Sequence, residues 1–418
     1  MKNNLLSFIW TVCLSLMFLS CSEEDLDDQI KLENNGSNKH FVDFKRAESI
    51  AIEIEFEIYH KDASGRQGVM MKSKKKVSGA TSIPDTKGVP VCHIFNYSEG
   101  GFVLLSADDR TEPLLAYSNE GRFELDPESL PFGPRGWLDG VSEHIAELRL
   151  STNNETDSIN MDLWKVSTIE NVLARTGRTS NLTSKNEPCY DPKNDCHLEN
   201  QCNAPPPKII GPLLQSTWGQ RDGYNNLAPY KNCGDTNNGR ALTGCISVAM
   251  AQVMKYHEEP SSRYDFSLMP MTTGSHETSR LIRDIGNTVN MKYDCDNSWA
   301  YPWLVDGGMG AYSYGGAIHE EFNHNRVLSD LNRNRPVILE GKEKPLVSFN
   351  FDHLWHVWVC DGYKRLSYCH EGILYQWLYL HMNWGWNGND NGWYAFNNWN
   401  PDGTTLNHRM RMTRNIKP

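Results

Sequence analysis

Three features that mark common classes of protein are missing from this sequence. It has no basic stripe, and 41 Lys and Arg residues are outnumbered by 52 Asp and Glu residues, for a formal net charge of -11. This balance argues against a general nucleic-acid-binding protein. There is no internal repeat, and no cysteines are spaced as C-x-x-C pairs. The 39% of hydrophobic residues and 13 Trp in 418 residues are typical of an ordered globular protein with two or three domains.

The N-terminus also has no apolar run long enough to span a membrane. The run from residue 5 to residue 19 is about 15 residues long, follows a charged start and ends at small residues, which is the pattern of a secretory signal. Cys21 follows this run and resembles the lipidated cysteine of bacterial lipoproteins. We therefore predict a lipoprotein-type signal peptide over residues 1–21 and an acidic and polar tether over residues 22–40.

The tether sets the expected location of the protein. Its start, residues 22–28, is acidic and resembles the tether that sends lipoproteins of some Gram-negative bacteria to the cell surface, although an ordinary acidic linker has the same composition. We expect an exported protein that is lipid-anchored in the outer membrane, and either exposed on the cell surface or released after activation.

The cysteine count fits an exported, oxidising setting. Without Cys13 and Cys21, nine cysteines remain, so at least one should be unpaired within the chain. Their connectivity is not readable from sequence. Local bridging is plausible among Cys189, Cys196 and Cys202, and a metal knuckle is the alternative, which the spacing and the compartment disfavour.

The first half of the chain predicts a small α+β domain over residues 41–150. Its first stretch, residues 41–60, fits a helix and an alternating strand equally well. Beyond it we predict three strands and a helix, over residues 89–97, 101–106, 114–118 and 137–150.

A polar segment rich in Pro and Cys, residues 151–208, marks a boundary, although residues 161–165 would keep part of it packed. Residues 209–418 then predict a second domain with a helical first half and a β-rich second half, which is an α+β layout. The expected helices span residues 243–257 and 276–290, and the expected strands span residues 353–363, 376–384 and 392–396.

The rest of the chain is organised around Cys245, which is predicted to lie at the N-terminus of the first of these helices. Unpaired N–H groups and the helix dipole favour a thiolate there, and a thiolate is the form in which cysteine is a nucleophile. The alternative is a small buried core cysteine.

A nucleophilic cysteine needs a base, a group that orients the base, and donors for the oxyanion. His356 is the candidate base, with His353 and His381 as runners-up. Asn383 and Trp384 could orient and shield the imidazole. Gln220 could donate to an oxyanion beside the Cys245 N–H. Cysteine on a helix, followed by histidine and asparagine on later strands, is the order of papain-like cysteine peptidases.

The sequence resembles the streptopain family of secreted bacterial cysteine peptidases, and in particular its lipoprotein members from Bacteroides and relatives. The resemblance covers about residues 90–125 and 209–418. The motifs that carry it are Thr243-Gly-Cys-Ile-Ser-Val-Ala-Met-Ala-Gln-Val-Met-Lys-Tyr-His257, Ile285-Gly-Asn-Thr-Val-Asn-Met291, His381-Met-Asn-Trp-Gly-Trp386, and the ending Ile416-Lys-Pro418.

The resemblance implies a papain-like fold with Cys245 as nucleophile and His356 as general base and acid. It also implies that Asn383 and Trp384 orient and shield the imidazole and that Gln220 lies in the oxyanion hole. Residues 101–118 resemble the family's inhibitory propeptide. Residues 41–150 would then be a folding aid and intramolecular inhibitor, removed by cleavage within residues 151–208.

This chain departs from streptopain at two places near the expected cleft. Trp355 stands before the histidine where streptopain has glycine, and residues 400–409 replace a mobile glycine-rich loop. The departures affect inherited substrate preference and leave the chemistry in place.

We therefore expect a secreted cysteine endopeptidase, made as a zymogen, that hydrolyses protein and peptide substrates through a Cys245 thioacyl-enzyme. Host proteins are one class of candidate substrates. The chemistry needs no metal or organic cofactor. Two other classes stay open from the sequence: a cysteine acyltransferase or cell-wall amidase, and a catalytically silent inhibitor or binding protein.

Overall fold

The computed structural model describes residues 39–61, 67–127, 129–150, 163–173, 204–234, 238–342, 355–370, 373–396 and 410–418. Residues 40–418 make up one compact unit. The predictions for the signal peptide, for Cys21 and for Cys189, Cys196 and Cys202 lie outside the described residues, as does His353.

The first half contains two helices and six strands. They are α1 (Phe44–Glu53), β1 (Glu55–Lys61), β2 (Gln67–Lys74), β3 (Val77–Pro84), β4 (Pro90–Tyr97), β5 (Phe102–Ser106), β6 (Leu114–Ser118) and α2 (Phe132–Leu150). The ambiguous stretch 41–60 is a helix followed directly by a strand. Asp43 caps α1 by accepting a hydrogen bond from the Arg46 N–H, and the helix ends before Ile54.

The strands predicted near β4, β5 and β6 are confirmed, whereas α2 begins five residues before the predicted start at residue 137. The early turn of α2 contains Gly133, Pro134 and Gly136, which interrupt the apolar pattern. Proline is tolerated in the first turn of a helix because the N–H that it lacks would have no partner there.

The second half carries the elements that position Cys245 and His356. Its elements are α4 (Val166–Leu173), β7 (Lys208–Ile210), α5 (Cys245–His257), the 3-10 helices η4 (Phe266–Leu268) and η5 (Pro302–Leu304), α6 (His276–Thr288), α7 (Val305–Gly310), β8 (Ile318–Glu321), α8 (His324–Leu331), β9 (Val337–Lys342), β10 (Trp355–His370), β11 (Ile373–Asn383), β12 (Gly392–Ala395) and β13 (Arg411–Arg414).

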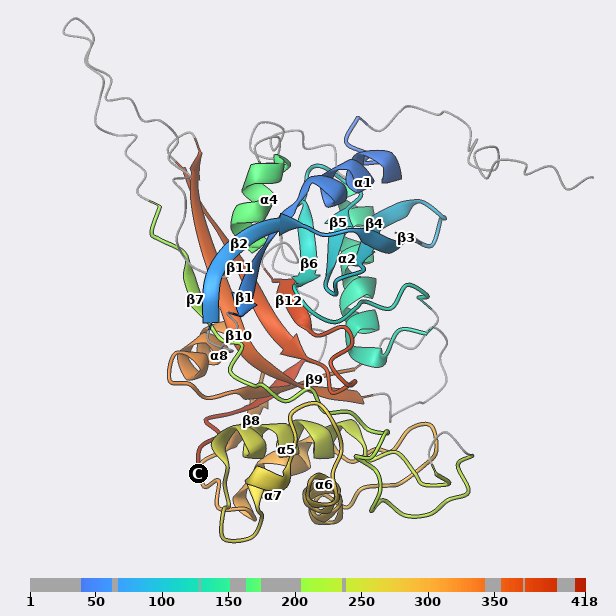
Figure 1. Cartoon of the computed structure of the whole chain (residues 1–418), viewed down its shortest axis with the longest axis vertical. Coiled ribbons are helices and arrows are strands. Elements are labelled where there is room, and N and C mark those ends of the chain that lie inside the picture. The colour runs from blue at the N-terminus through green and yellow to red at the C-terminus, as the bar shows by residue number, and fades with distance from the viewer. Residues whose placement is uncertain are drawn as a thin grey trace, which may run out of the picture. The chain divides into compact units, whose positions relative to one another are not determined.

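One large sheet runs through both halves, in the order β3-β4-β5-β6-β12-β11-β10-β9-β13-β8, with β7 added alongside β10 (Figure 1). The two halves meet where β6 pairs with β12, through Tyr117 opposite Trp393 and Ala116 opposite Tyr394. The sequence predicted separate domains, and the structure shows that their strands belong to one sheet. The pairing is antiparallel throughout.

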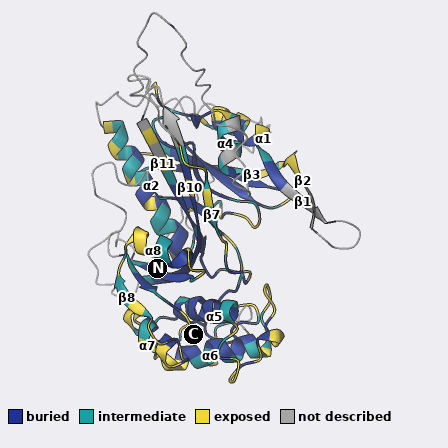
Figure 2. Ribbon diagram, turned by 90° about the vertical axis from the view of Figure 1, so that its left-hand side faces the viewer, coloured by how far each residue is buried: buried dark blue, intermediate teal, exposed yellow. Residues whose placement is uncertain are grey.

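Helices cover both faces of this sheet around β10. Val357 and Val359 belong to the core that contains α5. Trp358 and Cys360 belong to the core that contains Leu138, Val141 and Ile145 of α2. Successive side chains of a strand point to opposite faces. It follows that α5 packs on one face of β10 and α2 on the other, and Figure 2 shows these central strands and α5 as buried.

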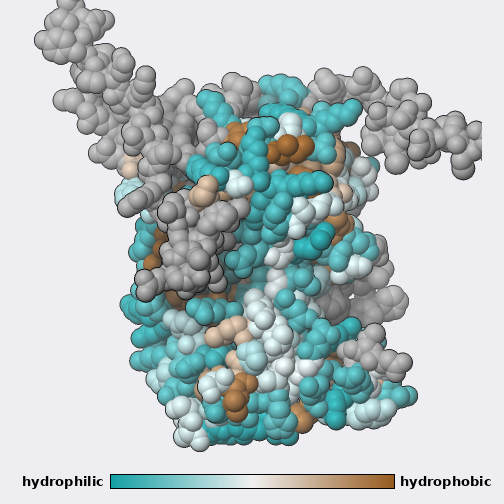
Figure 3. All heavy atoms as spheres, in the orientation of Figure 1, coloured by the Kyte–Doolittle hydropathy of each residue, from teal (hydrophilic) through white to brown (hydrophobic). Residues whose placement is uncertain are grey.

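The outer surface is mostly hydrophilic, with apolar side chains in small scattered patches on the face shown in Figure 3. Among the described helices, none is long and apolar enough to span a bilayer. The structure contains a disulfide between Cys233 and Cys295, and Cys92, Cys245 and Cys360 are free. The prediction that at least one cysteine stays unpaired is confirmed.

Candidate active site

Cys245 is the first residue of α5, directly after Gly244. The backbone of Gly244 has φ 83°, and a Cβ there would lie 2.6 Å from Met291 and 3.1 Å from the Ser298 carbonyl, so only glycine fits at this entry to the helix. The helix itself is mostly apolar and is almost wholly buried. The sequence therefore folds so that Cys245 sits at a fixed place on a rigid helix.

The thiol of Cys245 is held in its neutral form in this structure. Burial raises the pKa of Cys245 to about 11, although the backbone N–H groups of Val357, Ile246 and Cys245 act to lower it. The helix N-terminus supplies the donors that the sequence predicted. Desolvation outweighs them, so the expected thiolate is not the favoured form here.

His356 lies on β10. The next residue of this strand is Val357, whose N–H faces the Cys245 sulfur. Its Nε2 is 3.0 Å from the Trp384 carbonyl oxygen. Because a carbonyl can only accept, Nε2 carries the proton. The imidazole stacks on Trp386 at 5.5 Å between ring centroids and on Trp358 at 5.8 Å. Burial lowers the pKa of His356 to about 4, against the raising effect of the Trp384 carbonyl, so the imidazole is neutral at pH 7.

The first turn of α2 lies directly on the candidate base. A Cβ placed on Gly133 would lie 2.7 Å from the Cδ2 atom of His356 and closer still to the Trp384 ring. Trp384 is itself fixed, because its indole N–H donates to the Tyr394 hydroxyl at 3.0 Å. His356 and Trp384 are therefore covered by the N-terminal half of the chain, and the described residues contain no hydrogen bond between Cys245 and His356.

Asn383 does not contact the imidazole in the way the sequence predicted. Its Oδ1 accepts from Gln252 Nε2 at 3.1 Å and from the Gly385 N–H at 3.3 Å, and its Nδ2 donates to the Ser216 carbonyl at 2.8 Å. The group that accepts the His356 proton is the backbone carbonyl of the next residue, Trp384. A backbone acceptor of this kind has no sequence signature.

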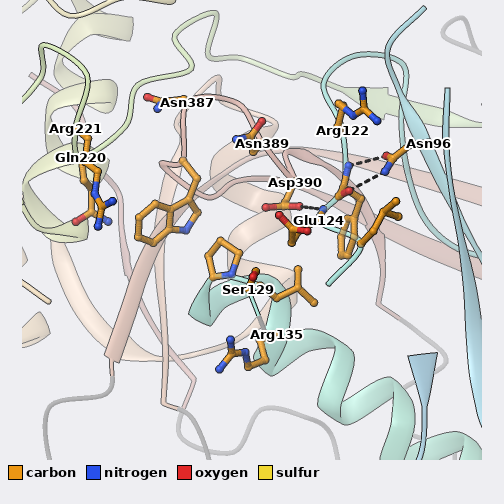
Figure 4. A pocket seen from close by; sticks show the side chains of 15 residues that line it. Asn96, Arg122, Glu124, Ser129, Arg135, Gln220, Arg221, Asn387, Asn389 and Asp390 are labelled. Atoms are coloured by element: carbon orange, nitrogen blue, oxygen red, sulfur yellow. Dashed lines mark hydrogen bonds between the residues drawn. The ribbon is translucent and has the colours of Figure 1, made fainter. Parts of the chain in front are cut away.

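Gln220 lies close to the start of α5, because its carbonyl accepts from the Thr243 N–H at 3.3 Å. Gln220 also lines a cavity of about 700 Å³. Figure 4 shows this cavity, with Gln220 and Asn387 on one side and Ser129 and Arg135 of the first half on another. The cavity thus lies between the two halves of the chain.

The first half also holds the loop beyond Trp384 by its backbone. The Asp390 N–H donates to the Arg122 carbonyl at 3.0 Å, and Asp390 Oδ1 accepts from the Glu124 N–H at 2.9 Å (Figure 4). Burial raises the pKa of Asp390 to about 7. Residues 122–124 therefore bind the same loop that carries Trp386.

The runner-up histidine His381 serves a different part of the fold. Its Nδ1 is 2.6 Å from Asp361 Oδ1, and Asp361 Oδ2 accepts from the Leu214 N–H at 2.9 Å. The pair anchors the chain that follows β7. The sequence reasoning missed Trp386 and Trp358 as stacking partners of His356. It also missed Gly133, whose Gly-Pro pair at a helix start was its only signal.

A cysteine at the mouth of a buried helix, a histidine on a neighbouring strand and an indole beside it define a papain-like cysteine peptidase site. Residues 218–268 and 261–394 match the Peptidase C10 family, and residues 57–145 match the Spi protease inhibitor family. Over these residues the chain is similar to cysteine peptidases of the peptidase C10 family, and its first half contains a region similar to the Spi protease inhibitor.

Proteins similar to this chain include a bacterial thiol protease and streptopain. Thiol protease/hemagglutinin PrtT of Porphyromonas gingivalis is 26% identical, and the match covers 74% of this chain and 34% of that protein. The chain therefore corresponds to about a third of the length of PrtT. Streptopain of Streptococcus pyogenes is 21% identical, with 74% of each chain covered. A solved fragment of Prevotella intermedia prointerpain A shares the fold, with a TM-score of 0.50, 21% identity, 81% of this chain covered and 99% of that chain.

Proposed function

We propose that this chain is the zymogen of an endopeptidase in which Cys245 is the nucleophile and His356 is the general base and acid. His356 takes up the proton of the Cys245 thiol, and the sulfur attacks the carbonyl carbon of a peptide bond. The C–N bond of that peptide then breaks, which leaves a thioester. The amide of Gln220 and the Cys245 N–H hold the oxyanion, and His356 gives its proton to the leaving amine. Water then attacks the thioester, its proton passes to His356, and the thiolate leaves.

The observation that carries this proposal is that α2 covers His356 and Trp384. The residue after His356 on the strand is Val357, and its N–H faces the Cys245 thiol. Burial keeps both the thiol and the imidazole neutral. Removal of α2 would return water to the imidazole, which raises the pKa of His356 and favours its protonation by the thiol. The same contact that buries the base would therefore keep the chain latent.

We also propose that residues 41–150 act as the propeptide, 151–208 as the segment that is cleaved, and 209–418 as the catalytic domain. Within and just after that segment, two anchors lie on either side of residues 174–207. Ile169 and Leu173 of α4 are buried in the core that also contains α1 and β4. On its other side, β7 pairs with β10 through Ile210 opposite Tyr363. Cutting between these anchors would free the first half without disturbing β7.

The full-length chain, before and after processing, tests this proposal with a peptidyl electrophile that labels an active-site thiol and with casein as substrate. We expect labelling at Cys245 and casein hydrolysis only after processing, and neither in a Cys245→Ala chain. Labelling without hydrolysis would support an acyl-transfer enzyme instead. A processed wild-type chain that neither labels nor cleaves would contradict the assignment of Cys245 as nucleophile.

We further propose that the protein is exported and anchored by a lipid on Cys21, with protein substrates outside the cell. The support is the apolar run of residues 5–19, the cysteine that follows it and the acidic segment 22–28. An alkyne-tagged fatty acid supplied to the expressing bacterium is expected to label the wild-type protein and not a Cys21→Ala variant. Equal labelling of the two would rule out this anchor.

A further inference from the structure

Gln252 is a fully buried polar residue on the mostly apolar helix α5, seven residues after Cys245. Burying an amide without hydrogen-bond partners is energetically unfavourable. A polar side chain in such a place therefore has to be satisfied by specific hydrogen bonds, and the bonds of Gln252 all lead toward the candidate active site.

The carbonyl oxygen of Gln252 binds the segment that precedes Gln220. Gln252 Oε1 accepts from the Trp218 N–H at 3.0 Å and from the Ser216 hydroxyl at 3.2 Å. Since a backbone N–H can only donate, the Trp218 contact fixes which end of the Gln252 amide is the oxygen. The other end, Nε2, then donates to Asn383 Oδ1 at 3.1 Å.

The orientation of the Asn383 amide is fixed in the same way. The Gly385 N–H requires an oxygen, and the Ser216 carbonyl requires an N–H donor, so Oδ1 and Nδ2 are placed without ambiguity. Asn383 Nδ2 also lies 3.3 Å from Gln252 Oε1, so the two amides face each other as a reciprocal pair.

The next link is a single peptide group. The Gly385 N–H that Asn383 holds and the Trp384 carbonyl that accepts from His356 belong to the same peptide unit. In a trans peptide, the N–H and the C=O point in opposite directions. Asn383 binds the N–H of this peptide and His356 binds its C=O. The peptide therefore fixes the position of the imidazole relative to the Asn383 amide.

We infer that Gln252 is a positioning residue for the reaction, which holds the His356 imidazole through Asn383 and the Trp384–Gly385 peptide. This inference rests on the proposed function of Cys245 and His356. The same amide ties the 216–218 segment, which leads to Gln220, to the helix that carries the nucleophile. The Gln252 side chain thereby fixes the positions of α5, of residues 216–218 and of His356 relative to one another.

The relay requires an amide at position 252. A glutamate there would keep the acceptor for Trp218 but would lose the donor to Asn383 and place a carboxylate oxygen against Asn383 Oδ1. The Asn383 amide would then be driven to turn over, which presents its NH2 group to the Gly385 N–H. A methionine would remove both the acceptor and the donor while keeping a similar volume.

The experiment compares Gln252→Glu, Gln252→Met and the matched control Ser247→Ala in the full-length chain after processing. Ser247 is a fully buried polar residue of the same helix, and its hydroxyl has no hydrogen-bond partner among the described residues. We expect both Gln252 variants to lower kcat on a casein-derived peptide by about 10- to 100-fold, with KM changed less than about twofold, because misplacement of a base reduces turnover more than binding. Ser247→Ala should keep both constants.

Two further readouts separate positioning from a loss of stability. If Gln252 acts through Asn383, the double variant Gln252→Met/Asn383→Ala should be no slower than the slower single variant, whereas independent sites would add. The pH profile of the Cys245 alkylation rate should also shift to higher pH in the Gln252 variants, because a misplaced imidazole stabilises the thiolate less. This readout needs no peptide substrate.

Wild-type kcat and an unshifted alkylation profile in a folded Gln252→Met or Gln252→Glu chain would overturn the inference. Additive losses in the double variant would do the same. Failure of the proposed function looks different, because Cys245→Ala and the wild type would then behave alike in casein hydrolysis.

Discussion

Replacing His356 with glutamine is expected to lower kcat/KM of the processed enzyme on a casein-derived peptide by at least about 10⁴-fold, as removal of a catalytic histidine does in other nucleophilic peptidases. Glutamine keeps a polar side chain of similar size but cannot take up a proton. The thiol would then lack a base and the leaving amine an acid. Steady-state kinetics after processing by an added protease measures the effect.

The matched control is His381→Gln. His381 is the other described histidine that the sequence left open as a base, and it is bound to Asp361 beside the chain that follows β7. We expect this variant to lose thermal stability but to keep kcat/KM within a few-fold. If His381→Gln abolished turnover and His356→Gln did not, the assignment of the base would be reversed.

Substituting Gly133 with alanine is expected to raise the labelling rate of Cys245 in the unprocessed chain by at least about tenfold. The new methyl group would overlap His356 and Trp384, and overpacking of this kind costs about 1–3 kcal/mol. The packing of α2 against His356 and Trp384 would be less favourable by this free energy. The uncovered, reactive form would be more populated, and labelling by a peptidyl electrophile followed by mass spectrometry would detect it.

Gly136→Ala supplies the control on the same helix. A Cβ on Gly136 would meet no atom within 4 Å, so this substitution changes helix propensity without touching the site. It should stabilise α2 slightly and leave the labelling rate unchanged or lower. Equal rates in the two variants would show that the Gly133 contact does not control access to Cys245.

The parts of the fold that the sequence predicted are those with strong local signals. The helix at Cys245 carries ten buried residues in a row, and β4 and β5 are bounded by clear turns. Strands β8, β9 and β13 were missed, and β13 pairs with both β8 and β9, which lie far from it in the sequence. Their formation is decided by tertiary contacts that a single sequence does not display.

The sequence predicts the members of the candidate site, but it does not predict the protonation state of Cys245 and His356 in the structure. Residue types and order identify Cys245, His356 and Trp384 as candidates, but the protonation of the pair depends on how far it is desolvated. That depends on where α2 lies, which no local pattern encodes. The role of the Trp384 carbonyl in place of the Asn383 side chain was likewise invisible, because every residue has a backbone carbonyl. Gln252 could have been noticed as a lone amide on a buried apolar helix.

The shared sheet has a consequence for the proposed removal of the first half. Release of the first half would take β6 away from β12 and leave β12 as an edge strand, with free N–H and C=O groups along one side. Such edges attract other strands and promote self-association. Only two residue pairs join β6 to β12, so the new edge is short and offers little to a second molecule. Under the proposed activation, the sheet edge that β12 presents would therefore be only a few residues long.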